Sequence, residues 1–164
     1  MNSTGIGVIA AGAGVAAVLA VLPATAATST SPQIHTLSFM DKANPKTSAD
    51  IDGGAKGFSV GDQQVFIDRI LQAGRQVGTL VGVGEVVALT GKRLTAQGVA
   101  TLRLPDGTLT GQVTFTELLA EGPPPVQHLA ITGGTGEYAV ATGECTSRVI
   151  GRTDNSRDVC SLRY

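Results

Sequence analysis

The sequence predicts an all-β fold, in which antiparallel strands close into a barrel or pack as a sandwich. Three observations favour this fold class. Apolar residues recur with a period of two, turn residues separate the apolar runs at short intervals, and no run has the spacing of an amphipathic helix. Roughly eight strands are expected, and either architecture would leave few strand edges exposed.

The N-terminal segment has the pattern of a secretory signal peptide. Residues Gly5 to Leu22 are uncharged and apolar, and small residues follow at Ala24 and Ala26. We expect a signal peptide at residues 1–26, a flexible spacer at 27–33, a barrel domain at 34–164 and a secreted mature protein. The alternative is an uncleaved membrane anchor, because the apolar run is near the lower limit for a span and "MNST" contains no Lys or Arg. A membrane is a partner only in that case.

Composition limits the classes of partner. Twelve basic and thirteen acidic residues nearly cancel and Trp is absent, so nucleic acid is not an expected partner. The two histidines, His35 and His128, stand alone, and no metal site is predicted. In an exported chain, Cys145 and Cys160 are expected to form a disulfide across the last hairpin, around "GRTDNSRD". Free thiols are the alternative.

The strands are expected in the following order. "IHTLSFMDK" at residues 34–42 is the first, and the Pro, Asn, Asp and Gly content of residues 43–56 indicates a long loop. Alternation then predicts strands within "FSVGDQQVFIDRILQ", "VGTLVGVGEVVAL", "RLTAQGVATLRL", "TLTGQVTFTEL" and "VQHLAIT".

The alternation also predicts which residues face inwards. Leu102 shares one face with Leu94, Ala96 and Ala100. The strand from Val77 to Leu89 is apolar on both faces, which is typical of a strand covered on both sides or lying at a subunit contact. The second explanation predicts a homo-oligomer, a trimer or a dimer. The glycines on one face of this strand suit a bend or an interior with room for a ligand.

The glycine-rich stretch "GGTG", Gly133 to Gly136, is expected to be a hairpin turn. A phosphate-binding Walker loop needs a Lys-Ser or Lys-Thr pair and a following helix. Here "EYAVATGECTSRV" follows and alternates as a strand does, while residues 84–92 have the wrong spacing. The sequence therefore predicts no nucleotide-binding loop.

The stretch "LAITGGTGEYAVATGE" resembles a hairpin shared by plant allene oxide cyclases and dirigent proteins. It is closer still to small secreted actinobacterial proteins with an allene-oxide-cyclase-like barrel. "HTLSFMDK", "FSVGDQQVFIDRIL", "GRQVGTLVGVGEVV" and "TLRLPDGTLTGQVTF" follow the expected order, so the resemblance covers Ile34 to Tyr164. It implies an eight-stranded antiparallel barrel with an apolar lumen and no cofactor, often trimeric in the plant relatives. Such barrels hold a reactive small molecule in one conformation while it cyclises or couples.

Three carboxylates are candidate catalytic groups because each is in phase with apolar neighbours: Asp68, Glu85 and Glu117. A carboxyl group inside an apolar barrel has a raised pKa and can act as an acid. The alternative is that each lies at a strand end or faces water. Of the dirigent segment Asp-Asp-Pro-Leu-Thr, this sequence keeps only Asp68. Thr142 stands where dirigent proteins often have an arginine. Both differences weaken the inference that this protein has dirigent activity. The pocket is expected to be lined by Phe66, Leu80, Leu102, Phe115 and Tyr138.

The sequence thus predicts a secreted barrel that binds a hydrophobic small molecule and guides its cyclisation or stereoselective coupling. Any enzymatic activity would be that of a cofactor-free isomerase or cyclase. The alternative is a non-catalytic barrel, a carrier or a structural surface protein. The lumen distinguishes them: a cavity with a carboxylate or tyrosine inside favours chemistry, and a lumen filled with Leu and Phe favours the structural role.

Overall fold

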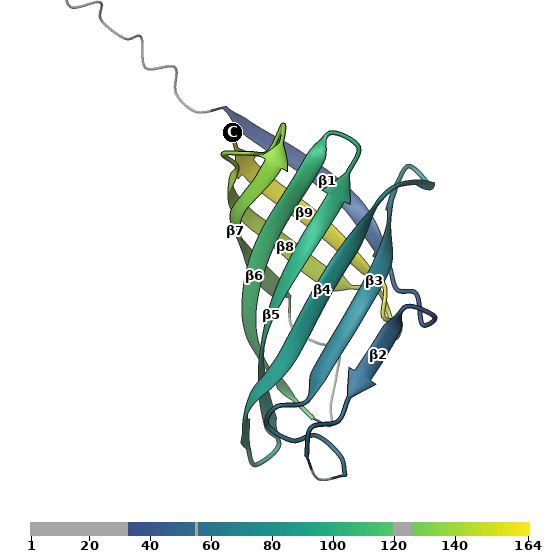
Figure 1. Cartoon of the computed structure of the whole chain (residues 1–164), viewed down its shortest axis with the longest axis vertical. Helices are drawn as coiled ribbons and strands as arrows, with labels where there is room; N and C mark the ends of the chain where they lie inside the picture. Colours follow the sequence, from purple (N-terminus) through teal and green to yellow (C-terminus); the bar gives the residue numbers. More distant parts are fainter. Residues whose placement is uncertain (1–32, 55, 120–125) are drawn as a thin grey trace, which may run out of the picture.

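The computed structural model describes residues 33–54, 56–119 and 126–164, and these residues form nine strands (Figure 1). No helix among them has the length and apolar character that a membrane crossing needs. The predicted signal peptide and most of the spacer lie outside the described residues. The strands are β1 (Ile34–Lys42), β2 (Ser48–Ile51), β3 (Gln63–Gln72), β4 (Arg75–Thr90), β5 (Arg93–Leu104), β6 (Gly107–Leu118), β7 (Gln127–Gly136), β8 (Thr142–Val149) and β9 (Ser156–Arg163).

Eight of these strands close into an antiparallel barrel, which confirms the predicted fold. The pairing runs β1-β9-β8-β7-β6-β5-β4-β3, and β1 returns to β3. This closing pair is short, because only Met40 to Lys42 pair with β3. The ninth strand, β2, pairs with the other half of β3, at Gln63 to Phe66. Residues 43–56 were predicted to be a loop throughout, but they contain strand β2. This strand pairs with the part of β3 that β1 does not reach.

Apolar side chains seal one end of the barrel. Phe39, Ile70, Leu102, Leu109, Ile131, Tyr138 and Leu162 belong to one buried cluster. The hairpins β3–β4, β5–β6 and β7–β8 and the C-terminus lie at this end (Figure 1). A second, smaller cluster, formed by Val86, Leu94 and Ala96, lies towards the β4–β5 turn. The inward phases predicted for β5 are confirmed.

A disulfide joins Cys145 and Cys160, as the sequence predicted, and the described residues contain no free cysteine. The two residues are directly opposite each other on β8 and β9. Both are buried in the cluster at the sealed end. The bond therefore fixes the register of the last two strands inside the core.

The prediction for the "GGTG" stretch was wrong in its detail. Gly133 to Gly136 are the last four residues of β7, and the chain reverses over residues 137–141, where Ala141 donates its N–H to the carbonyl of Tyr138. Gly136 has a φ of 62°, and a Cβ there would meet the carbonyl oxygen of Asp106. These glycines let two hairpins approach closely, and strand β8 follows them, so the exclusion of a Walker loop stands.

Candidate functional site

A cavity of about 930 Å³ occupies the barrel interior. Its wall includes Leu102 and Ile131 of the cluster that seals one end, and Phe115, which packs against the second cluster. Residues of the β1–β2 connection and of the β8–β9 turn, such as Pro45 and Thr153, form its rim. The predicted pocket residues Phe66, Leu80, Leu102 and Phe115 all line it.

The cavity exists because small residues stand at inward positions of the central strands. Gly84 on β4 is directly opposite Gly98 on β5, and Ala100 on β5 is opposite Gly111 on β6. A Cβ added to Gly84 would approach only the carbonyl of Gln97, at 3.9 Å. Large apolar side chains at these positions would fill the lumen, as they do in small closed barrels.

Asp41 lies at the inner side of the site, near the end of β1. Period-two alternation turns Leu37, Phe39 and Asp41 inwards, while Met40 and Lys42 are exposed. Asp41 is 8% exposed and lines the cavity, and its Oδ1 has no hydrogen-bond partner. Burial and the neighbouring charges of Asp68 and Asp158 raise the pKa of Asp41 to about 8. This raised pKa favours the neutral carboxylic acid form of Asp41 at pH 7.

Two further aspartates face the same space from neighbouring strands. Asp158 on β9 is 5% exposed and accepts hydrogen bonds from the Ser156 hydroxyl at 3.0 and 3.1 Å. Asp68 on β3 is 7% exposed and accepts the backbone N–H of Asn44 at 2.9 Å. Burial raises the pKa of both carboxyl groups, and these hydrogen bonds act in the opposite direction. Both therefore ionise more readily than they would if equally buried without donors.

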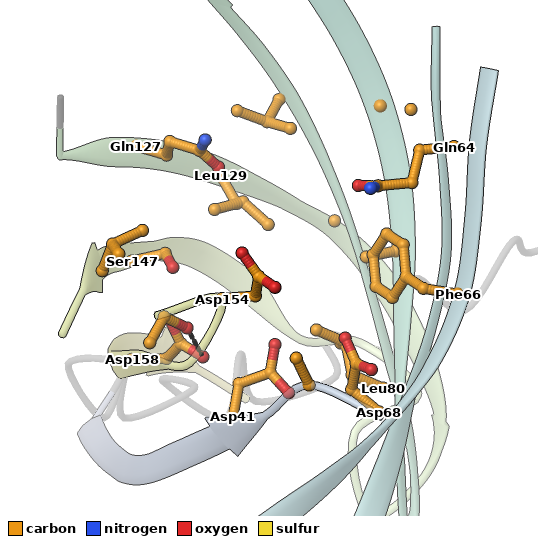
Figure 2. Close-up of a pocket in the computed structure, with 18 of the residues that line it drawn as sticks. Asp41, Gln64, Phe66, Asp68, Leu80, Gln127, Leu129, Ser147, Asp154 and Asp158 are labelled. Atoms are coloured by element: carbon orange, nitrogen blue, oxygen red, sulfur yellow. Dashed lines mark hydrogen bonds between the residues drawn. The ribbon is translucent and has the colours of Figure 1, made fainter. Parts of the chain in front are cut away.

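Figure 2 shows the carboxyl groups of Asp41, Asp68, Asp154 and Asp158 turned towards one region, with Phe66 and Leu129 on either side of it. Asp154 lies in the β8–β9 turn and is exposed. Within the described residues, no group of three or more His, Cys, Asp or Glu side chains is arranged to hold a metal ion. The carboxylates thus surround a space that is larger than a metal site.

The three predicted carboxylates are not brought together. Asp68 and Glu117 line the cavity, but Glu85 does not. Glu85 is opposite Gln63 and the exposed Gln97, on the outer face of the barrel, so the interior position expected for it is not observed. Glu85 does share a face of β4 with Val83 and Val87, as predicted. Because both faces of this strand are apolar, the sequence could not show that this face is the outer one. The catalytic roles stay predictions.

Two other predicted residues lie away from the cavity. Tyr138 is 5% exposed and packs edge-on against Tyr164, with ring centroids 5.4 Å apart. It belongs to the cluster at the sealed end, and it is not among the residues that line the cavity. His128 faces outwards, as expected, where its Nδ1 lies 2.9 Å from Oε1 of Glu144.

Sequence reasoning missed Asp41 and Asp158, although a signal for each was present. Asp41 is in phase with Phe39 on a strand whose bounds were predicted correctly. Asp158 is in phase with Cys160 and Leu162, but the stretch around it had been interpreted as the turn of the last hairpin. The turn occupies residues 150–155 instead, which places Asp158 inside a strand.

The sequence model of the allene oxide cyclase barrel like domain matches residues 43–160. The chain belongs to this family. No curated protein sequence matches the chain significantly. The solved structures similar to this allene oxide cyclase-like barrel include proteins with different chemistries, and the barrel is their common feature.

A pyocyanin demethylase is 28% identical over 78% of this chain and 99% of its own, with a TM-score of 0.66. The Diels Alderase AbmU from Streptomyces koyangensis is 17% identical over 82% of this chain and 70% of its own, with a TM-score of 0.61. The pterocarpan synthase dirigent protein GePTS1 is 18% identical over 81% of this chain and 89% of its own, with a TM-score of 0.58. The last two likenesses concern the fold alone.

The buried carboxyl group of Asp41 predicts a pH-dependent stability. Its pKa is about 8 in the folded chain against an ordinary value of 3.8, so the folded state binds more protons between these pH values. The free energy of unfolding should therefore fall as the pH rises from about 4 to about 8 and level off above that. Asp41→Asn cannot ionise and should be more stable than the wild type at pH 8, by roughly 2–4 kcal/mol.

Urea unfolding followed by circular dichroism at pH 5, 6, 7 and 8 measures this difference. Asp106→Asn, at an exposed turn position at the sealed end, is the control and should follow the wild-type curve. A residual slope is expected in Asp41→Asn, because burial also raises the pKa of Asp68 and Asp158. Equal slopes in the wild type and in Asp41→Asn would show that Asp41 is ionised in the folded protein.

Proposed function

We propose that this barrel binds a largely apolar small molecule in its cavity and guides a cyclisation or stereoselective coupling of that molecule, without a cofactor. The observation that supports this most directly is a cavity of about 930 Å³ with the buried, unpartnered carboxyl group of Asp41 on its wall. A purely structural barrel gains nothing from either feature. An empty lumen loses packing contacts, and an unsatisfied buried polar group costs stability.

The cavity wall supplies shape, and the aspartates supply polar groups. Apolar side chains such as Phe66, Leu80 and Leu129 surround the space and exclude water from a bound molecule. Holding two reacting ends of one molecule in contact lowers the entropic part of the barrier to ring closure. An isomerising cyclisation conserves all atoms and electrons and requires no oxidant or reductant. A coupling requires that the molecule reaches the cavity already oxidised to its reactive radical form.

Asp41 would act through its buried carboxyl group. Its neutral form can donate a hydrogen bond to an oxygen of an uncharged substrate, and its ionised form stabilises positive charge that the substrate carries or develops in the transition state. Asp158 and Asp68, held by Ser156 and by the N–H of Asn44, are placed to orient the same molecule. The name of a similar solved structure, a pyocyanin demethylase, supports chemistry on a small organic molecule.

The second candidate function is a non-catalytic carrier. The apolar wall supports it, because such a wall would retain a hydrophobic molecule whether or not it reacts. The buried Asp41 favours chemistry, since a carrier could hold the same molecule with apolar side chains alone. Conversion of the bound molecule, to an isomer of equal mass by cyclisation or to a heavier product by coupling, separates the two functions.

A substitution that fills the cavity tests ligand binding. We expect the wild-type protein, incubated with a metabolite extract of the organism that produces it, to retain a small molecule in native mass spectrometry. Gly84→Phe should lose that molecule, because its ring would occupy space next to Gly98 inside the lumen. Val87→Phe, on the exposed outer face of the same strand, is the matched control and should retain it. Retention by Gly84→Phe equal to that of the wild type would contradict binding in the lumen.

We also propose that the protein is exported after cleavage behind Ala26, as the apolar run and the small residues before this position suggest. The expected observation is a chain that begins at Ala27 in the culture medium of the producing organism. N-terminal sequencing of that chain measures it. A full-length chain recovered only from the membrane fraction would favour the anchor instead.

Self-association is proposed for the outer face of β3, β4 and β5. Val65 is opposite Val83, Val83 is opposite Val99, and Ile67 is opposite Val81, so these apolar residues form one continuous patch. Ile67 and Val99 are 43% and 42% exposed. A second copy of the chain would present the same patch and cover this one, which fits the homo-oligomer expected from the sequence.

Light scattering after size-exclusion chromatography measures the oligomeric state. The wild type is expected to elute as a dimer, and Ile67→Glu as a monomer, because a charge would be buried without a partner at the contact. Val140→Glu alters a more exposed apolar residue in the β7–β8 turn, away from the patch, and should behave as the wild type does. A monomeric wild type at micromolar concentration would exclude the proposed contact.

A further inference from the structure

Charge distinguishes this cavity from an ordinary apolar pocket. Among the described residues that line it are Asp41, Asp50, Asp68, Glu117, Asp154 and Asp158, and none is Lys, Arg or His. The one ion pair among the described residues joins His128 and Glu144 on the outer face. No described side chain therefore neutralises the acidic groups inside the barrel.

The deep part of this acidic lining groups three buried acids. Asp41, Asp68 and Asp158 come from three strands, β1, β3 and β9, that meet at the short closing pair. Each of these three aspartates is less than 9% exposed, and Asp41 Oδ1 has no partner in the protein. Three buried acids that face one space repel one another as they ionise, and a positive charge between them would remove that repulsion.

The space next to the aspartates suits a flat apolar body. The Phe66 ring lies against Gly82, where a Cβ would collide with the ring, so the glycine leaves the room that the ring needs at the wall. Leu129 lies across the cavity from Phe66 (Figure 2). An aromatic or polyene group fits between such surfaces, with its polar end towards the aspartates.

We propose that the ligand of this site is an organic cation: a flat apolar molecule with one positively charged nitrogen, which lies among Asp41, Asp68 and Asp158. This inference rests on the proposed function and specifies its substrate class. It excludes molecules that carry a carboxylate or phosphate, since their charge would face six acidic side chains without a basic one. It also favours an organic ion over a metal ion, because the described acidic side chains form no metal-sized cluster.

Binding of the cation should release a proton. Without a bound cation the protonated form of Asp41 is favoured at pH 7, because burial and two acidic neighbours raise its pKa to about 8. A bound positive charge stabilises the ionised form, so the proton leaves as the cation enters. The other groups that face Asp41 are Asp68 on β3, Asp158 and Ser156 on β9, and Asp154 in the β8–β9 turn. They contribute acidic or neutral groups only.

Three flat tricyclic probes of similar size test the charge preference: N-methylacridinium, phenazine and acridine-9-carboxylate, which are a cation, a neutral molecule and an anion. In equilibrium dialysis at pH 7, the cation should bind about tenfold more tightly than phenazine, and the anion should not bind measurably. Calorimetry in buffers of different ionisation enthalpy should show release of up to about one proton per cation bound and none with phenazine.

Variants separate the charge from the cavity itself. Asp158→Asn and, independently, Asp68→Asn should each weaken binding of the cation by about tenfold and leave the affinity for phenazine unchanged. Asp41→Asn should abolish the proton release that accompanies cation binding. Asp106→Asn, outside the site, should bind as the wild type does. Circular dichroism checks that each variant is folded, and two independent substitutions keep the test valid if one variant is not.

The outcomes distinguish the two proposals. If phenazine and the cation bind equally and Gly84→Phe abolishes both, the cavity binds small molecules but the charge preference is wrong. If the anion binds most tightly, the charge preference is likewise wrong. If no probe binds, or Gly84→Phe binds all of them unchanged, both the cation site and the proposed binding function are overturned.

Discussion

The site depends on one packing constraint: the middle of a closed barrel has been left without side-chain volume. An eight-stranded barrel is just wide enough for its inward side chains to fill it. Here the facing pairs Gly84 with Gly98 and Ala100 with Gly111 withdraw that volume at one level. The clusters around Leu102 and Leu94 fill the levels on either side. The cavity is therefore set by a few small residues, on a framework stabilised elsewhere.

The second element of the site arises from the way the barrel closes. β1 pairs with β3 over only three residues before the chain turns away and returns as β2. Inward positions next to this break are buried, yet they adjoin the cavity, and Asp41 and Asp68 occupy them. Such positions reduce stability when they hold acids. The disulfide between β8 and β9 and the apolar cluster at the sealed end compensate for part of that cost.

Much of the fold followed from the sequence, because a period of two specifies strands and their faces directly. It placed Leu102, Phe115 and Asp68 correctly on the inner side. It could not decide which face of β4 is inside, since both are apolar, and Glu85 was misplaced for that reason. The glycines at 133–136 were predicted to be a turn, because glycine is typical of tight turns. Glycine is equally suited to a strand end where two hairpins approach closely, which is where these residues lie. The grouping of Asp41 with Asp158 depends on barrel closure, which joins strands from opposite ends of the chain.

The same framework can serve different chemistries because its inward positions vary independently of its pairing. Backbone hydrogen bonds and the sealed end fix the wall, whereas the residues beside the cavity determine what enters. A lining with several carboxyl groups and no described basic residue would discriminate between ligands by their charge as well as by their shape. An uncharged apolar cavity of equal size would favour neutral molecules, because a charge buried there would have no partner. In the proposed function the aspartates would therefore determine the specificity, and the glycines provide the space in which they act.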